Sequence, residues 1–159
     1  MLEASERRQL DELGYLVLPG FVSSSMLAEL RERVEALWAQ EGEQAGSEFR
    51  HEPGTRRLAN LVDKGRIFAE LVAMPAILER VEHVIGPACK LANRTDRCRR
   101  ALHAFYTRRD KPQQQYQKAL LRPETIAALT PLQRRVLAID DAENDRLSSA
   151  TSRMSGFLK

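Results

Sequence analysis

The chain has 159 residues, of which 43% are apolar and 30% are charged, and these values are typical of one globular domain. No run approaches the roughly 20 consecutive apolar residues that a transmembrane helix needs. The N-terminal residues MLEASERRQL are too charged for a secretory signal peptide. Cys89 and Cys98 have no zinc-type spacing, so free thiols are expected. The composition therefore predicts a soluble cytoplasmic protein and excludes a membrane partner.

The net charge of +3 conceals an uneven distribution along the chain. Residues 1–89 carry 10 basic and 15 acidic side chains, whereas residues 90–135 carry 12 basic and 3 acidic ones. Such a local excess creates a positive potential that attracts phosphates or carboxylates. The charge pattern therefore indicates an anionic partner for residues 90–135 without identifying it.

The N-terminal part is predicted to contain two helices separated by a strand. SERRQLDELG predicts a helix with Ser5 as its N-cap and Gly14 as its end. YLVLPGF, residues 15–21, predicts a short buried strand that ends at Pro19-Gly20. The serines at 23–25 can cap a helix over residues 26–40. In that helix five apolar residues recur at helical spacing: Leu27, Leu30, Val34, Leu37 and Trp38.

The middle of the chain is predicted to alternate between loops and short elements. Residues 41–56 are rich in glycine and charge, which favours a loop, and residues 57–65 fit either a strand or an irregular segment. IFAELVAM and PAILERVEHVIG predict two short helices, with Pro75 in a first turn and Gly86 as a stop. RALHAFYTR, residues 100–108, is rich in aromatic residues and predicts a strand.

The C-terminal part is predicted to be helical and then loose. KPQQQYQKALL and ETIAAL favour short helices. Thr130-Pro131-Leu132-Gln133 has the pattern of a capping box, which predicts a helix that continues to Ile139. Residues 140–159 are polar and are expected to form a loose tail.

The histidines do not have the spacing of an iron site. A site with two histidines and one carboxylate places an acid two residues after a histidine, because strand alternation then puts both on one face. His51, His83 and His103 are followed at that spacing by Pro53, Ile85 and Phe105. GxSxG, GxGxxG and GxxxxGK[ST] motifs are also absent. We therefore predict no metal ligand and no catalytic residue, and each histidine is expected to be a surface or packing residue.

A cluster of arginines is the remaining candidate for a site. On a strand over residues 99–107, Arg99 shares one face with His103 and Phe105. An arginine on the inward face of a strand requires an anionic partner. Its planar guanidinium can donate two parallel hydrogen bonds to a carboxylate. Three interpretations stay open, which are a solvated surface, a small-anion site and a nucleic-acid patch. The absence of a recognisable nucleic-acid-binding motif argues against the last.

Two stretches of the chain resemble parts of one family. DELGYLVLPGFVSSSMLAELRERVEALW, residues 11–38, is similar to the N-terminal region of proteins of the phytanoyl-CoA dioxygenase family. ANRTDRCRRALHAFYTRRD, residues 92–110, resembles the last barrel strand of that family. The resemblance implies a double-stranded β-helix, or jelly roll, that holds Fe(II) through a His-x-Asp pair and a distal histidine. It also implies 2-oxoglutarate as a cofactor and hydroxylation of a small organic or acyl substrate.

The resemblance assigns three cofactor-binding positions. Arg99 matches the arginine that pairs with the far carboxylate of 2-oxoglutarate. Asn93 and Thr95 match the polar residues that lead into the last strand, and Thr95 is expected to assist at the same carboxylate. The distal histidine of the family falls at Ala88 in this chain, and only residues 86–97 remain for the His-x-Asp pair.

These departures indicate that the barrel core is missing. An eight-stranded jelly roll needs on the order of 80 residues for its core. We therefore predict an α+β, mostly helical chain, made of the flanking helices and edge strands of a jelly-roll oxygenase with the barrel core truncated. Residues 1–139 would form a single truncated oxygenase-like domain with a seam near residues 90–92, followed by the tail at 140–159.

Two functions follow from this prediction. The first is an oxygenase-like protein that is inactive because it lacks the metal triad, and for which iron binding is in doubt. The alternative is a helical interaction module, because helices without a sheet to cover would expose apolar faces and self-associate. A basic nucleic-acid-binding protein is a third and weaker alternative.

Overall fold

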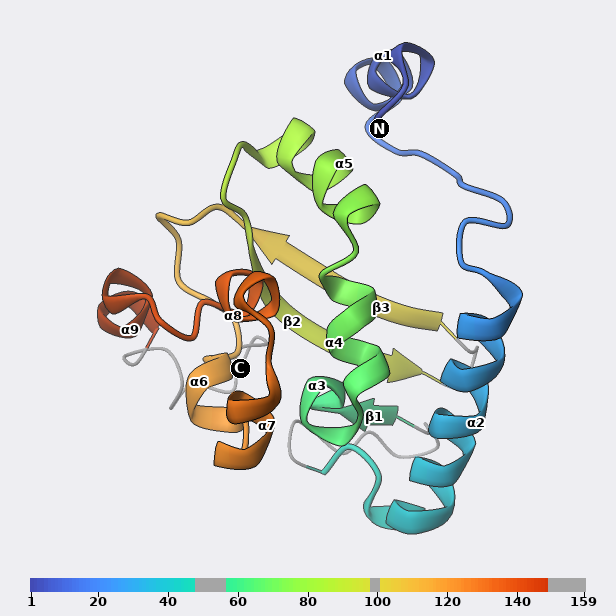
Figure 1. The fold of residues 1–159 in the computed structure, drawn as a ribbon, viewed down its shortest axis with the longest axis vertical. Helices are drawn as coiled ribbons and strands as arrows, with labels where there is room; N and C mark the ends of the chain where they lie inside the picture. Colours follow the sequence, from blue (N-terminus) through green and yellow to red (C-terminus); the bar gives the residue numbers. More distant parts are fainter. Residues whose placement is uncertain (48–56, 98–100, 149–159) are drawn as a thin grey trace.

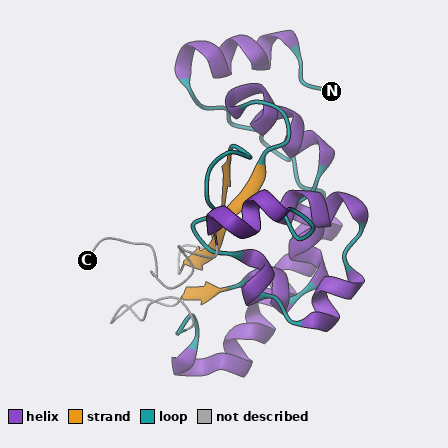
Figure 2. Ribbon diagram, turned by 90° about the vertical axis from the view of Figure 1, so that its left-hand side faces the viewer, coloured by secondary structure: helices purple, strands orange, loops and turns teal. Residues whose placement is uncertain are grey.

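The computed structural model describes residues 1–47, 57–97 and 101–148, and there the chain is mostly helical with one small antiparallel sheet (Figure 1). The sheet has the strand order β1-β2-β3, formed by β1 (Arg57–Ala59), β2 (Lys90–Arg97) and β3 (Ala101–Thr107). Most of the helical structure lies on one side of the sheet (Figure 2). The fold is therefore of the α+β class, as predicted.

Both N-terminal helices form where the sequence predicts them. α1 (Ala4–Leu13) ends at Gly14, whose φ of 74° is left-handed, but its N-cap is Glu3 rather than Ser5. Glu3 and Glu6 form a reciprocal capping box, which satisfies more backbone donors than one serine hydroxyl would. α2 (Ser24–Glu41) is capped by Ser23, whose hydroxyl accepts a hydrogen bond from the Met26 backbone at 3.2 Å. A short 3-10 turn, η1 (Gly42–Gln44), follows.

The strand predicted at residues 15–21 is wrong, because this segment is an extended connection between α1 and α2. Tyr15 is 59% exposed and Val17 is 68% exposed. A strand requires a neighbouring strand to satisfy its backbone groups, and none of the three described strands pairs with these residues. Apolar β-forming residues alone therefore do not create a strand here.

The segment before β2 contains three helices. Residues 57–65, which the pattern left open, form β1 and then α3 (Leu61–Lys64). α4 (Arg66–Val72) and α5 (Pro75–Ile85) confirm the two short helices, with Pro75 in the first turn of α5 and Gly86 after its end. Of the loop predicted at 41–56, the structure describes residues 41–47. Within these residues the short turn η1 forms.

β2 and β3 form the main pair of the sheet. Lys90 is paired with Thr107 at one end and Arg97 with Ala101 at the other. The register shifts between Leu91 and Asn93, so Ala92 is an extra residue on β2. This irregularity lies in the predicted seam at residues 90–92, although β2 itself runs through it.

The C-terminal part is helical beyond the predicted limit. The described helices are α6 (Gln117–Leu120), α7 (Pro123–Ala128), α8 (Pro131–Leu137) and α9 (Ala142–Ser148). The Thr130–Gln133 capping box is confirmed, but α8 ends at Leu137, because Ala138 is left-handed with a φ of 55°. The expected loose tail is wrong for residues 142–148, since they form α9 with Asn144 and Ser148 fully buried. Residues 149–159 lie outside the described residues.

The core consists of two apolar clusters between the sheet and the helices. One contains Val72, Leu78, Leu91, Val136 and Leu137 among its buried members. The other joins α2 to β1 and α4, with these buried residues: Leu30, Val34, Leu37, Trp38, Leu58, Leu61, Ile67 and Phe68. The apolar faces of the helices are thus mostly buried against the small sheet and one another. This removes the exposed faces on which the expectation of self-association depended.

Candidate functional site

The site predicted from the family motif lies on β2 and on the connection to β3. Asn93 is the register partner of Phe105, and Thr95 lies between His103 of β3 and Ala59 of β1. Arg99, the third predicted residue, lies outside the described residues. The structure therefore brings the backbones of Asn93 and Thr95 into one sheet, and the role of Arg99 stays a prediction.

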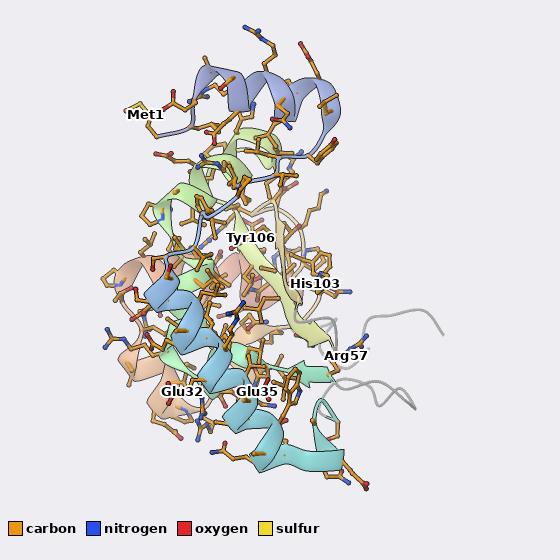
Figure 3. The ribbon with its side chains drawn as sticks, turned by 90° about the vertical axis from the view of Figure 1, so that its right-hand side faces the viewer. Met1, Glu32, Glu35, Arg57, His103 and Tyr106 are labelled. Carbon is orange, nitrogen blue, oxygen red and sulfur yellow. The ribbon has the colours of Figure 1, made fainter. Side chains whose placement is uncertain are left out.

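The two faces of β3 differ in what covers them. Tyr106 points toward the helices, where its hydroxyl donates to the Val72 carbonyl at 2.9 Å, and Leu102 packs against the second core cluster. His103 and Phe105 are exposed, with ring centroids 6.4 Å apart and nearly parallel planes. Figure 3 labels Tyr106 and His103 on this strand. Phe105 is 50% exposed. Asn93 and Thr95 are thus the register partners of the exposed row of β3.

The described side chains do not fit the iron site that the family resemblance implies. His83 Nε2 lies 2.7 Å from Asp11 Oδ1 and joins α5 to α1, far along the chain from β3. His103 is exposed and stacks on Phe105, and His51 lies outside the described residues. Within residues 1–47, 57–97 and 101–148, no three histidine, cysteine, aspartate or glutamate side chains come together as a metal site. We therefore assign no metal-dependent step.

A buried polar network surrounds Lys90, which the sequence patterns did not identify. Lys90 is fully buried, and its ammonium donates to Asn144 Oδ1 at 2.8 Å and to the Arg109 carbonyl at 3.0 Å. Gln113 donates from Nε2 to the Leu91 and Leu137 carbonyls at 2.7 and 3.1 Å, and its Oε1 accepts from Asn144 at 3.0 Å. The network joins β2, the segment before α6, α8 and α9, so it closes the C-terminal helices onto the sheet.

Burial shifts the pKa values of two neighbouring residues, Lys90 and Cys89. It lowers the pKa of Lys90, because the charged ammonium loses its hydration, while Asp141 acts in the opposite direction. Burial also raises the pKa of the Cys89 thiol, which is only 2% exposed. A buried protonated thiol is a poor nucleophile. Cys89 is a free thiol, as expected. Cys98 lies outside the described residues.

The basic residues from 108 to 135 are paired with carboxylates. Each of these side chains lies within 3.6 Å of an acid, in the pairs Arg108–Asp110, Arg109–Asp141, Lys111–Asp110, Lys118–Asp145, Arg122–Asp63, Arg134–Asp140 and Arg135–Glu82. Asp63 and Glu82 come from the acidic N-terminal part, and the other partners outside this segment follow α8. Folding therefore compensates much of the positive charge, which weakens the case for a nucleic-acid patch.

The comparison with protein families shows which family the chain belongs to. Residues 10–146 match the family described as Phytanoyl-CoA dioxygenase (PhyH). The chain belongs to this family. The match extends across both sides of residues 90–92 and covers the end of α1, all of α2 and the three strands of the sheet. It also includes most of α9, which was not expected to belong to the domain.

The other comparisons add no relative. Neither the curated proteins nor the solved structures contain a match to this member of the phytanoyl-CoA dioxygenase family. Among the described residues, no helix has the length and apolar character needed to cross a membrane.

Proposed function

We propose that this chain is a shortened member of the phytanoyl-CoA dioxygenase family that does not act as an oxygenase. The connection between α5 and β2 carries this proposal. α5 ends at Ile85 and β2 begins at Lys90, so only residues 86–89 separate them. The core of a jelly roll needs on the order of 80 residues. Under the proposal, that length is missing between residues 10–85 and residues 90–146, which lie within one family match.

The short connection also leaves no room for the iron ligands. Residues 86–97 read GPACKLANRTDR, which contains no histidine and has Asp96 as its only acid. A His-x-Asp pair is therefore absent from the stretch where the family carries it. The residues of this chain supply no replacement within the described parts, and the proposal assigns no step to iron.

The chain retains the motif that would bind a carboxylate. Under the proposal, the Arg99 guanidinium grips the far carboxylate of 2-oxoglutarate with two parallel hydrogen bonds. The Thr95 hydroxyl donates to the same carboxylate, and Asn93 flanks it. Support comes from the register, because Asn93 and Thr95 pair with the exposed residues Phe105 and His103. A ligand on that side of the sheet would not have to displace the helices.

Anaerobic titration with Fe(II) and 2-oxoglutarate tests the loss of oxygenase activity. We expect no visible charge-transfer band, and no succinate release after oxygen is admitted, because the ligand set is incomplete. A clear band together with succinate release would overturn the proposal.

Calorimetric titration with 2-oxoglutarate alone tests the retained carboxylate site. We expect weak saturable binding that is lost in Arg99→Met, because a methionine cannot donate to a carboxylate. Arg108→Met is the matched control, since Arg108 is exposed and already paired with Asp110 at 3.0 Å. Equal binding by both variants would argue against Arg99 as the carboxylate ligand.

A further inference from the structure

A cavity lies on the helical side of the sheet, and neither the family resemblance nor the proposed function uses it. Its volume is about 320 Å³, and its walls come from α2, α3, α4, α7 and α8. Figure 1 shows α4 and α8 near the middle of the molecule, with α3 and α7 below them. The apolar part of the lining includes Val62, Ala69, Ala128 and Leu129. The volume is at the lower end of the range of pockets for small organic ligands.

Four cationic side chains line the cavity, and three of them have a carboxylate partner. Arg122 pairs with Asp63 at 2.9 Å, Lys64 with Glu41 at 2.7 Å, and Arg66 with Glu70 at 2.6 Å. Asp63 also accepts from the Thr125 hydroxyl at 2.6 Å, and these hydrogen bonds help to lower its pKa against the effect of burial. The first two pairs join the start of α7 to α3 and α3 to α2, whereas Arg66–Glu70 lies within α4. All three pairs leave little charge for a ligand.

Arg33 is the exception among the four. Its Nε donates to the Lys64 carbonyl at 2.6 Å, and the side chain is partly buried. Among the described residues, no carboxylate pairs with Arg33. A guanidinium that is partly removed from water without an anionic partner is unfavourable, and its two terminal amino groups can donate to a bound anion.

Gln133, on α8, supplies a second donor to the same cavity. Its side chain is 7% exposed and lines the same cavity. Its Oε1 is occupied, because it accepts from the Thr130 backbone at 2.9 Å in the capping box. The Nε2 group of Gln133 has no acceptor within the described parts of the chain. The two N–H groups of Nε2 are therefore available to a ligand that accepts hydrogen bonds in this cavity.

We infer that this cavity binds a small organic anion, with a phosphate or carboxylate head held between Arg33 and Gln133 and a short apolar body against Val62, Ala69 and Leu129. The Arg33 guanidinium provides positive charge and N–H donors to the anionic head. The side-chain amide of Gln133 provides the second set of N–H donors. The volume limits the ligand to about the size of a substituted aromatic ring.

Calorimetry with three small ligands tests the site on the natural chain. Phenyl phosphate and benzoate share an aromatic body and differ in the anionic head, whereas benzyl alcohol is neutral. We expect saturable binding of at least one anion and none of benzyl alcohol, and the tighter anion identifies the head group. Absence of saturable binding by both anions would overturn the inference, as would equal binding of benzyl alcohol.

Variants separate this site from unspecific attraction of anions. Arg33→Met should weaken anion binding at least tenfold, whereas Arg31→Met, the same change two positions away on α2 and outside the cavity lining, should change it less than twofold. Gln133→Glu keeps the oxygen that completes the capping box but replaces the amide donor with a carboxylate. It should abolish binding with little change in the melting temperature, so it remains informative if Arg33→Met does not fold. Unchanged binding in Gln133→Glu would overturn the inference.

Discussion

Lys90 Nζ lies 2.8 Å from Asn144 Oδ1, although the two residues are 54 positions apart and belong to β2 and α9. Both side chains are fully buried. The contact brings a charged group from the predicted seam together with a helix from the predicted loose tail. It ties α9 to the sheet.

The first prediction concerns the stability of this contact. Asn144→Leu removes the side-chain acceptor of a buried ammonium, so it should lower the free energy of unfolding by about 3 kcal/mol. Urea denaturation measures the loss. The double variant Lys90→Met/Asn144→Leu should recover at least half of it, because no buried charge remains. A double variant as unstable as Asn144→Leu would contradict this explanation.

The second prediction concerns pH. The pKa of Lys90 in the folded chain is below its ordinary value, so between the two values the unfolded chain binds more protons than the folded chain. The free energy of unfolding of the natural chain should therefore rise relative to Lys90→Met as the pH increases toward the ordinary lysine pKa of about 10.4. Asp141, Glu143, Asp110 and Arg109, the charges that act on Lys90, are the same in both proteins. Parallel pH profiles of the two proteins would show that Lys90 titrates normally.

The third prediction concerns Tyr116, whose hydroxyl donates to Asp145 Oδ1 at 2.6 Å. Burial and this carboxylate raise the pKa of Tyr116 to about 12. Its stabilising effect is therefore complete below the ordinary pKa of about 10 and is lost as the pH rises through about 12. Asp145→Asn should lower the pKa of Tyr116, as measured by the tyrosinate absorbance. Tyr116→Phe assigns the transition, and an Asp145→Asn titration identical to the natural one would refute the role of the carboxylate.

The fourth prediction compares two glycines with similar backbone angles. Gly46 has a φ of +78°, and an added Cβ would lie 2.6 Å from the Arg57 carbonyl oxygen of β1. Gly14 has a φ of +74° and open space around it. Gly14→Ala should cost about 1 kcal/mol from backbone strain alone, and Gly46→Ala about 3 kcal/mol because β1 must also move. Urea denaturation of both variants measures the difference, and equal losses would show that this close approach is unimportant.

Local signals in the sequence predicted most of the helices correctly. Ser23 caps α2, Pro75 begins α5, and the Thr130–Gln133 capping box begins α8, because each depends on residues within one turn. The strand at residues 101–107 was also predictable from its aromatic residues. The strand predicted at 15–21 was wrong for the opposite reason, since a strand depends on a partner elsewhere in the chain.

The sequence by itself determined the presence of most helices, the family and the absence of a histidine from residues 86–97, because these depend on neighbouring residues and on motifs. It also named Asn93 and Thr95, but not that they pair with the exposed side of β3. Only the tertiary structure decided the burial of Lys90, the pairing of the basic segment with distant acids, and the cavity between Arg33 and Gln133. These features join groups far apart in the chain, and desolvation and hydrogen bonding act on distance in space rather than on spacing in sequence.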